Sequence, residues 1–519
     1  MSNNISRMVR NAMTMMAGTL ASRILGLVRE IITAAIFGAS RSLDAFYVAY
    51  TLANLARQLL AEGALSAAFV PIFARALDEK GSDRARDLAK QASGALIGAC
   101  IVVVSLGIFF TPWLVDVMAP GFDGEKAELA IKLTRWLFPF LMMVSLAALA
   151  MGVLNSMDRF FVPAVAPALS NLAYITVVVL FASRADVALL VWAVMIGGFL
   201  QMALQLFAAH REGVSLVPSL PKRDDPELKK MILLFLPYAA GLSLNQVNPV
   251  ISRIMGSFLQ DGAISVLTYA NRVIQLPLGL IVIAISQAVL PELSRCVVEG
   301  NDVFRDTVRD SVRFALFAIL PITLGACMVS DSVINVLFYR GAFDQWAWKA
   351  TSEALFMYAL GLPGMACSTV IMRALYAKGL SRSAVIVTSS SVVFNLILSY
   401  SMMKWIGFSG LALAPSVAFT ISAAVGIYLL SLRIGGPIGL FGFSWVSKMA
   451  ISGVVLFLSV RAFELLWPFP SQASLAIRSG WIGLIFISGM TSYGIITYGL
   501  RCGEWEWIKG AFRAKRKSR

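Results

Sequence analysis

Residues 18–37 read GTLASRILGLVREIITAAIF, and this stretch decides the fold class, because it is apolar over a membrane-spanning length yet contains Arg23 and Arg29. The next apolar stretch contains three more charged residues, Asp44, Arg57 and Glu62. A charge at the centre of a membrane helix costs at least ~2.5–3.5 kcal/mol on insertion scales, so such side chains face a protein interior or a water-filled cavity. Three arginines in two membrane helices therefore predict a cavity that holds an anion.

The composition indicates a membrane protein. The chain has 519 residues, of which 58% are apolar and 14% charged, and its mean hydropathy is +0.77. A soluble protein has about 25% charged residues. Apolar runs near the ~20 residues that span a bilayer recur along the whole chain. We predict an all-α polytopic membrane protein with about fourteen transmembrane helices, at approximately 12–36, 43–77, 91–115, 129–156, 161–183, 187–210, 229–258, 263–294, 308–328, 351–377, 383–403, 408–432, 443–465 and 480–500.

The distribution of positive charge predicts the topology. An even number of spans places both termini on one side of the membrane, and Lys and Arg concentrate in both tails and in the loops expected on that side. Cytoplasmic loops accumulate such residues, so we expect both termini in the cytoplasm. The same rule explains the net charge of +15 without a nucleic acid partner. The first apolar stretch has no small-residue cleavage site, which indicates a retained span rather than a signal peptide.

Polar connections divide the predicted helices into sets. Residues 1–210 are expected to form an N-lobe of six helices, 211–230 a cytoplasmic linker, and 231–432 a C-lobe of six helices. A Gly/Pro-rich connector then opens the region 433–519, which contains two more helices and a basic tail. A short match between Phe69-Val-Pro-Ile-Phe73 and Val289-Leu-Pro-Glu-Leu293, at equivalent places in the two halves, supports a two-lobed transporter.

Polar side chains concentrate in the first, second, seventh and eighth predicted spans. These four spans contain five arginines, namely Arg23, Arg29, Arg57, Arg253 and Arg272. Arginine suits bidentate contact with phosphate oxygens and stays charged in a low dielectric. Three acids, Glu30, Asp44 and Glu62, are available to neutralise them. The alternative is that these residues form internal ion pairs that only tie the helices together.

Motifs for enzyme chemistry are missing from the sequence. No glycine-rich loop is followed by Lys-Ser/Thr, and no His-Glu-x-x-His or nucleophile elbow occurs. The five cysteines are scattered without metal or redox spacing. We expect no catalytic residues, no metal and no cofactor, so that an ion gradient, the membrane potential or a downstream reaction supplies the energy.

Several motifs resemble the bacterial lipid II flippases, the MurJ (formerly MviN) family. The opening block carries most of the resemblance, and further blocks extend it over essentially the whole chain: Ser22-Arg-Ile-Leu-Gly-Leu-Val-Arg29, Asp44-Ala-Phe, Asn54-Leu-Ala-Arg57, Ala61-Glu-Gly-Ala-Leu-Ser66, Leu154-Asn-Ser-Met-Asp-Arg-Phe160, Ala166-Pro-Ala-Leu-Ser-Asn171, Tyr269-Ala-Asn-Arg272 and Leu337-Phe-Tyr-Arg-Gly-Ala-Phe343. One departure is Asn271, where many relatives have Asp.

The resemblance implies the fold of the multidrug/oligosaccharidyl-lipid/polysaccharide (MOP) exporter superfamily, with two six-helix lobes in a V and a hydrophobic groove on the last two helices. It implies translocation of lipid II, an undecaprenyl-diphosphate-linked peptidoglycan precursor, across the bacterial inner membrane for cell-wall biosynthesis. Cell-wall synthesis and division proteins are candidate partners. The family's essential positions correspond to Arg23, Arg29, Asp44, Arg57 and Arg272, together with Asn54, Glu62, Pro167 and Asn171.

Our hypothesis is alternating access. Substrate contacts are expected from Ser22, Arg23, Arg29, Asn54, Arg57 and Arg272, gating ion pairs from Glu30, Asp44 and Glu62, and support of the cavity from Pro167, Asn171, Gln246 and Arg253. One alternative is a related exporter of other polyprenyl-linked saccharides or of drugs. The second alternative is a membrane enzyme acting on polyprenyl phosphates, which would need catalytic or metal-binding residues that the sequence lacks. The third is a non-catalytic scaffold, for which buried arginines would have no purpose.

Overall fold

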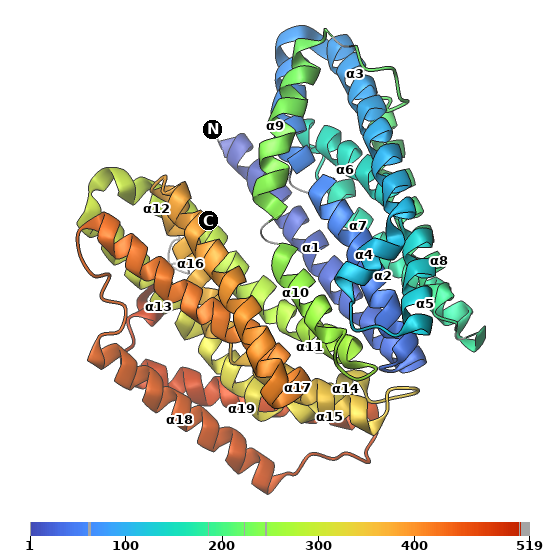
Figure 1. Cartoon of the computed structure of the whole chain (residues 1–519). Helices are drawn as coiled ribbons and strands as arrows, with labels where there is room; N and C mark the ends of the chain where they lie inside the picture. Colours follow the sequence, from blue (N-terminus) through green and yellow to red (C-terminus); the bar gives the residue numbers. More distant parts are fainter. Residues whose placement is uncertain are drawn as a thin grey trace. The chain divides into compact units, whose positions relative to one another are not determined.

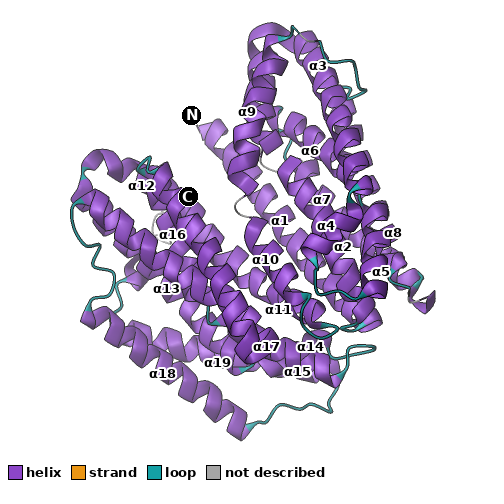
Figure 2. Ribbon diagram, in the orientation of Figure 1, coloured by secondary structure: helices purple, strands orange, loops and turns teal. Residues whose placement is uncertain are grey.

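The computed structural model describes residues 2–60, 64–184, 186–222, 224–243, 246–507 and 509. Every secondary-structure element in these residues is a helix (Figures 1 and 2). The chain divides into two units, each with its own internal packing. Unit 1 comprises residues 1–265 and 341–343, and unit 2 comprises residues 266–340 and 344–519. The lobe boundaries expected from the sequence stay a prediction, although the structure groups residues 231–265 with unit 1.

The helices of unit 1 are mostly long and apolar. Their bounds are α1 Ser2–Phe37, α2 Arg41–Leu60, α3 Ala64–Phe109, α4 Thr111–Met118, α5 Gly124–Leu137, α6 Phe140–Ser156, α7 Phe161–Leu180, η1 Ala182–Arg184, α8 Ala188–Arg211, α9 Pro226–Ser243 and α10 Val247–Gly256. Within the unit, α1 packs on α7, α7 on α8, and α3 on both α6 and α9. Figure 1 shows α9 alongside α3.

The helix α3 contains a break that lets it fold back on itself. Gly81 has a φ of +83°, a left-handed conformation that glycine adopts without steric cost. A β-carbon at this position would meet no atom within 4 Å, so the requirement for glycine is conformational. The residues before and after Gly81 correspond to parts of two successive predicted spans.

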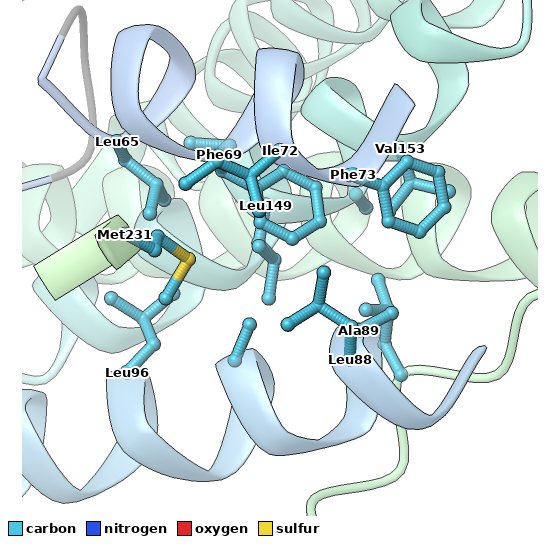
Figure 3. Packing of buried hydrophobic residues seen from close by; sticks show 14 of the residues in the cluster. Leu65, Phe69, Ile72, Phe73, Leu88, Ala89, Leu96, Leu149, Val153 and Met231 are labelled. Atoms are coloured by element: carbon cyan, nitrogen blue, oxygen red, sulfur yellow. The ribbon is translucent and has the colours of Figure 1, made fainter. Parts of the chain in front are cut away.

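The main hydrophobic core of unit 1 lies between the two arms of α3. Phe69 and Phe73 from the first arm are fully buried, and so is Leu88 from the second. Leu149 and Val153 of α6 complete the contact (Figure 3). Helices in a membrane associate through close van der Waals packing, so this cluster fixes the position of α6 against the arms.

Ion pairs fasten the start of α9 to α3. Nη2 of Arg84 lies 2.6 Å from both oxygens of Asp225 and 2.6 Å from Glu227. Oδ1 of Asp225 also accepts hydrogen bonds from the backbone N–H groups of Glu227 and Leu228 and so caps α9, while Pro226 occupies the first helical position. Burial alone would raise the pKa of Asp225, but these hydrogen bonds, with Arg84 foremost, hold that pKa below its usual value.

The helices of unit 2 follow the same pattern. Their bounds are α11 Ala263–Pro277, which starts in unit 1, the π-helix η3 Leu278–Val282, α12 Ile283–Glu299, α13 Asn301–Met328, α14 Ser330–Phe338, α15 Gln345–Ala359, α16 Leu362–Ala377, α17 Ser381–Ile434, α18 Phe443–Leu466 and α19 Leu475–Gly499. α18 and α19 pack on each other and on α13, and Figure 1 shows both in red.

The helices agree with the predicted spans. Nine helices of the described chain have the length and composition to cross a membrane, or ten if the bent pair α15–α16 counts as one span. Two of the nine, α3 and α17, each merge two helices across a backbone break. In α17 the break lies at Ile406 and Gly407. Each of the fourteen predicted spans falls on one or more helices, and the predicted all-α membrane fold is confirmed.

Candidate functional site

The guanidinium group of Arg29 lies within a polar cluster of unit 1. Its Nη2 is 2.8 Å from Oε1 of Glu30, and the Arg29 side chain is only 15% exposed. Nη1 donates to Oδ1 of Asn171 on α7 at 3.4 Å. The rings of Tyr50 on α2 and Tyr174 on α7 lie 5.7 and 5.2 Å from the guanidinium carbon. Cation–π contacts of this kind stabilise a cation that has lost part of its hydration, so three helices hold Arg29 in place.

A second arginine joins this cluster through Tyr47. The Tyr47 hydroxyl donates to Oε2 of Glu30 at 2.7 Å, and the guanidinium of Arg253 on α10 lies 5.7 Å from the Tyr47 ring. Nε of Arg253 donates to Oγ1 of Thr51 at 3.1 Å. We call the following residues the Arg29 cluster: Arg29, Glu30, Tyr47, Tyr50, Asn171, Tyr174 and Arg253. The predicted site residues Arg29, Glu30, Asn171 and Arg253 are therefore brought together.

Arg23 lies beside a separate cavity of unit 1, of about 270 Å³. We call it the Arg23 cavity, and its lining residues come from α1, α6, α7 and the turn before α7: Thr19, Ser22, Arg23, Met151, Asn155, Phe160, Pro163, Ala164 and Pro167. The predicted residues Ser22 and Pro167 thus share one cavity with Arg23. Nδ2 of Asn171 donates to the backbone oxygen of Ser22 at 3.2 Å, which connects the cavity to the Arg29 cluster.

Asp44 binds a lysine and a helix N-terminus. Its side chain is almost fully buried, and Nζ of Lys126 on α5 lies 3.1 Å from Oδ2 and 2.8 Å from Asp261. The backbone N–H groups of Gly262 and Ser265, at the start of α11, donate to the Asp44 carboxylate at 2.8 and 2.9 Å. The Ser265 hydroxyl adds a hydrogen bond of 2.7 Å. A carboxylate at this position accepts hydrogen bonds from the N–H groups that lack partners within α11, and its negative charge interacts favourably with the dipole of that helix.

The remaining predicted residues lie elsewhere in the two units. Nε of Arg57 donates to Oδ1 of Asn54 at 2.8 Å, one turn away on α2. Gln246 is half-buried immediately before α10. Arg272 belongs to α11 in unit 2, where its Nη1 lies 3.4 Å from Oε1 of Gln275. Glu62 lies outside the described residues. The roles expected for these residues stay predictions.

Unit 2 contains a larger cavity, and no charged side chain is among the described residues that line it. Its volume is about 580 Å³, and its lining consists almost entirely of apolar side chains and glycines from α11, η3, α13, α14, α15, α18 and α19. We call it the unit 2 pocket. Leu456 and Val460 of α18 and Ile485 and Phe486 of α19 are among its lining residues, and Gly483 leaves one wall without a side chain. Such a lining suits a long hydrocarbon chain.

Five partners in these networks were not found from the sequence. The tyrosines Tyr47, Tyr50 and Tyr174 enclose the cations, and Thr51 and Lys126 bind Arg253 and Asp44. Tyr47 and Tyr50 lie one turn apart on the helix that carries Asp44 and Arg57, and this spacing could have indicated that both tyrosines face the charged residues. Lys126 is far from Asp44 in the sequence, and its local pattern matches that of any solvated loop.

Solved structures identify the class of protein. The chain is similar to a lipid II flippase MurJ in an inward closed conformation, with a TM-score of 0.78, 25% identity and coverage of 94% of this chain and 98% of that one. It also resembles a multidrug resistance MATE family transporter of the MOP superfamily in an inward-facing conformation, with a TM-score of 0.67, 17% identity and coverage of 83% and 98%. Together with the buried cations and the apolar pocket, this defines a membrane transporter of the MOP exporter fold.

Sequence relatives specify the family. The model of the family described as lipid II flippase MurJ matches residues 33–472. The chain is 33% identical over 506 residues to a probable lipid II flippase MurJ of Rhizobium tropici, covering 95% of this chain and 94% of the relative. It is 33% identical over 437 residues to the lipid II flippase MurJ of Burkholderia cenocepacia, covering 82% and 84%. The chain belongs to the lipid II flippase MurJ family, and it is a transporter of the bacterial inner membrane rather than an enzyme.

Proposed function

We propose that the Arg29 cluster and the Arg23 cavity bind the diphosphate of lipid II, and that the unit 2 pocket takes up part of its undecaprenyl tail. The observation that supports this proposal best is the environment of Arg29, whose side chain is 15% exposed and whose guanidinium carbon lies 5.7 and 5.2 Å from two tyrosine rings. A guanidinium held in one plane binds phosphate oxygens through two parallel hydrogen bonds. The family's substrate carries such a group next to a long apolar chain.

The division between cation-lined and apolar sites matches the two ends of this substrate. The sugar–peptide head group and diphosphate need water and charge, whereas the tail needs an apolar surface. The unit 2 pocket of about 580 Å³ holds part of a polyprenyl chain, and the rest stays in lipid. Arg57 and Arg272 complete the proposed head-group contacts, as expected from the sequence.

Alternating access then moves the lipid from the inner to the outer leaflet, with both termini in the cytoplasm. Substrate drives such a cycle only if its affinity differs between the two states. Glu30 already binds Arg29 at 2.8 Å, so a diphosphate competes with this carboxylate for the cation. The membrane potential supplies ~2.3 kcal/mol per elementary charge per 100 mV, which is sufficient to bias the cycle.

The test is the leaflet distribution of lipid II when the protein is depleted from growing cells. We expect lipid II to accumulate on the inner leaflet, and restored expression to return it to the outer leaflet. A variant at an exposed ion pair, Arg75→Ala, should restore the distribution as wild type does, because Arg75 is 66% exposed on α3. An unchanged distribution in depleted cells contradicts the proposal.

A further inference from the structure

Two arginines of unit 2 lie against the last turn of α14. Nη2 of Arg340 donates to the backbone oxygens of Val336 and Leu337, the latter at 2.8 Å. Nη1 of Arg478, in the first turn of α19, donates to Oδ1 of Asn335 at 2.9 Å. Both guanidinium groups are half-buried. They therefore rest on one helix end, where backbone oxygens lack partners within the helix.

These cations are not balanced by acidic side chains. No carboxylate of the described chain pairs with Arg340 or Arg478, since the nearby Asp331 binds Lys349 at 3.0 Å. Nε of Arg478 is buried and has no acceptor among the described residues. Burial and the charge of Arg478 both lower the pKa of Arg340. The helix end offsets part of this charge, and the rest is available to an anionic ligand.

The unit 2 pocket begins next to these arginines. Ile482 and Phe486 lie one and two turns beyond Arg478 on α19, and both line the pocket. Residues four apart share one face of a helix. On α14, Val333 also lines the pocket, two residues before Asn335. An apolar pocket of about 580 Å³ therefore lies next to the two cations.

Aromatic side chains surround the same end of unit 2. Tyr339 stacks on Trp348 with ring centroids 4.8 Å apart, and Tyr339 is 38% exposed. Trp467, at the end of α18, is 46% exposed. Tyrosine and tryptophan concentrate where a membrane meets water, at the level of the lipid head groups. We therefore expect Arg340 and Arg478 to lie at the depth of a lipid phosphate.

We propose that Arg340 and Arg478 bind the diphosphate of a polyprenyl lipid that has reached the outer leaflet, while its tail occupies the unit 2 pocket. The inference rests on the proposed function, because cytoplasmic termini place residues 339–344 on the outer side. It adds a second diphosphate site, on the product side, to the one around Arg29. The polyprenyl lipid is preferred over a phospholipid because the adjoining pocket is the one that we assign to its tail.

The test uses the full chain in phosphatidylcholine nanodiscs with undecaprenyl diphosphate that carries a diazirine beside the diphosphate. After irradiation, mass spectrometry should find the label on residues 335–340 and 478–486. R340Q/R478Q should reduce this labelling about 10-fold, as expected for the loss of charge-assisted hydrogen bonds. The single variant Arg478→Gln leaves the contacts of Arg340 with α14 intact and should reduce it several-fold. Arg461→Gln is the control, because Arg461 is exposed and paired with Glu464.

Each other outcome has a defined meaning. If R340Q/R478Q and Arg478→Gln fold correctly and these residues are still labelled as in wild type, the inference is overturned. It is also overturned if phosphatidylglycerol competes with the labelled lipid as strongly as unlabelled undecaprenyl diphosphate does. Failure of the proposed function is seen separately, because Arg29→Ala should remove label from α1, α2 and α7 while leaving that on α14 and α19. If Arg29→Ala removes the label from α14 and α19 too, the second site is not independent and the inference is contradicted.

Discussion

Unit 1 and unit 2 differ in the chemistry of the side chains that they bury. In unit 1, Arg29, Glu30 and Arg253 lie among tyrosines and an asparagine, and Asp44 is buried against Lys126. In unit 2, the pocket is lined by aliphatic side chains and glycines of α13, α18 and α19. The charges of unit 1 are held by ion pairs and hydrogen bonds with which an anion can compete, whereas the open apolar surface of unit 2 favours contact with hydrocarbon. This difference agrees with our proposal, in which unit 1 binds the head of an amphipathic substrate and unit 2 takes up its tail.

The largest effect is expected from Arg29→Ala. The variant removes the cation proposed to bind the diphosphate and leaves the buried carboxylate of Glu30 without it. Loss of a hydrogen bond to a charged group costs ~1.5–3 kcal/mol, so lipid II translocation should fall about 10- to 100-fold. Translocation is measured with labelled lipid II in proteoliposomes, and Arg29→Lys should retain part of it. If Arg29→Ala transports at the wild-type rate, unit 1 does not bind the head group.

Asp44→Asn tests whether buried charge in unit 1 is also structural. The asparagine keeps the shape of Asp44 but leaves Lys126 with the more exposed Asp261. Removing one partner of a buried ion pair costs ~3–5 kcal/mol, so thermal unfolding in detergent should shift to clearly lower temperature. Asp261→Asn is the matched control, since the Asp261 side chain is 55% exposed and should contribute less than ~1 kcal/mol. Equal shifts for both variants would show that burial of Asp44 is unimportant.

Gly483→Phe tests the apolar side of the comparison. Gly483 lines the unit 2 pocket, and no atom lies within 4 Å of a β-carbon built there, so a phenyl ring has room to fill the pocket. A ring in the pocket removes van der Waals contacts between its lining and the tail, so affinity for the polyprenyl lipid should fall several-fold. Gly480→Phe, one turn earlier and outside the pocket lining, should bind as wild type does. Binding is measured in nanodiscs with undecaprenyl and short-chain diphosphates, and the short-chain lipid should be less affected.

The smallest effect concerns charge outside the membrane spans. Because the pKa of folded Asp225 is below its usual value, its contacts with Arg84 stabilise the fold above about pH 4 and lose this effect as the pH falls through the folded pKa. Arg84→Ala should therefore unfold at a slightly lower temperature than wild type at pH 7, and the difference should shrink below about pH 4. Melting curves at several pH values measure this difference. A difference that grows on acidification contradicts the assigned pairing.

Most of the fold could be predicted from the sequence, because membrane spans leave a strong local signal. The fourteen predicted spans fall on helices even where α3 and α17 continue through a break. The short helices α4 and α14 were not predicted, since eight and nine residues are too few to give an apolar run of spanning length. The MOP fold followed from the family resemblance rather than from hydropathy.

The candidate site was only partly predictable. Arg23, Arg29 and Asp44 stand out because charge is costly in an apolar stretch. The tyrosines around Arg29 and the lysine on Asp44 do not stand out, because such residues are ordinary in a membrane helix or a loop. Their partners lie far away in the sequence, as Tyr174 does from Arg29, and local patterns carry no information about such contacts.

The π-helix η3, from Leu278 to Val282, has a consequence for alignments of this region. A π-turn accommodates one residue more than an α-turn, so numbering the 263–299 segment at a uniform 100° per residue places every position beyond η3 about 100° away from the face that it occupies. Deleting a single amino acid within η3 should convert it to ordinary α-helix while Arg272 upstream and Leu293 downstream keep their orientations. A one-residue deletion at this point therefore changes the local helical pitch and leaves the two flanking helical segments in register.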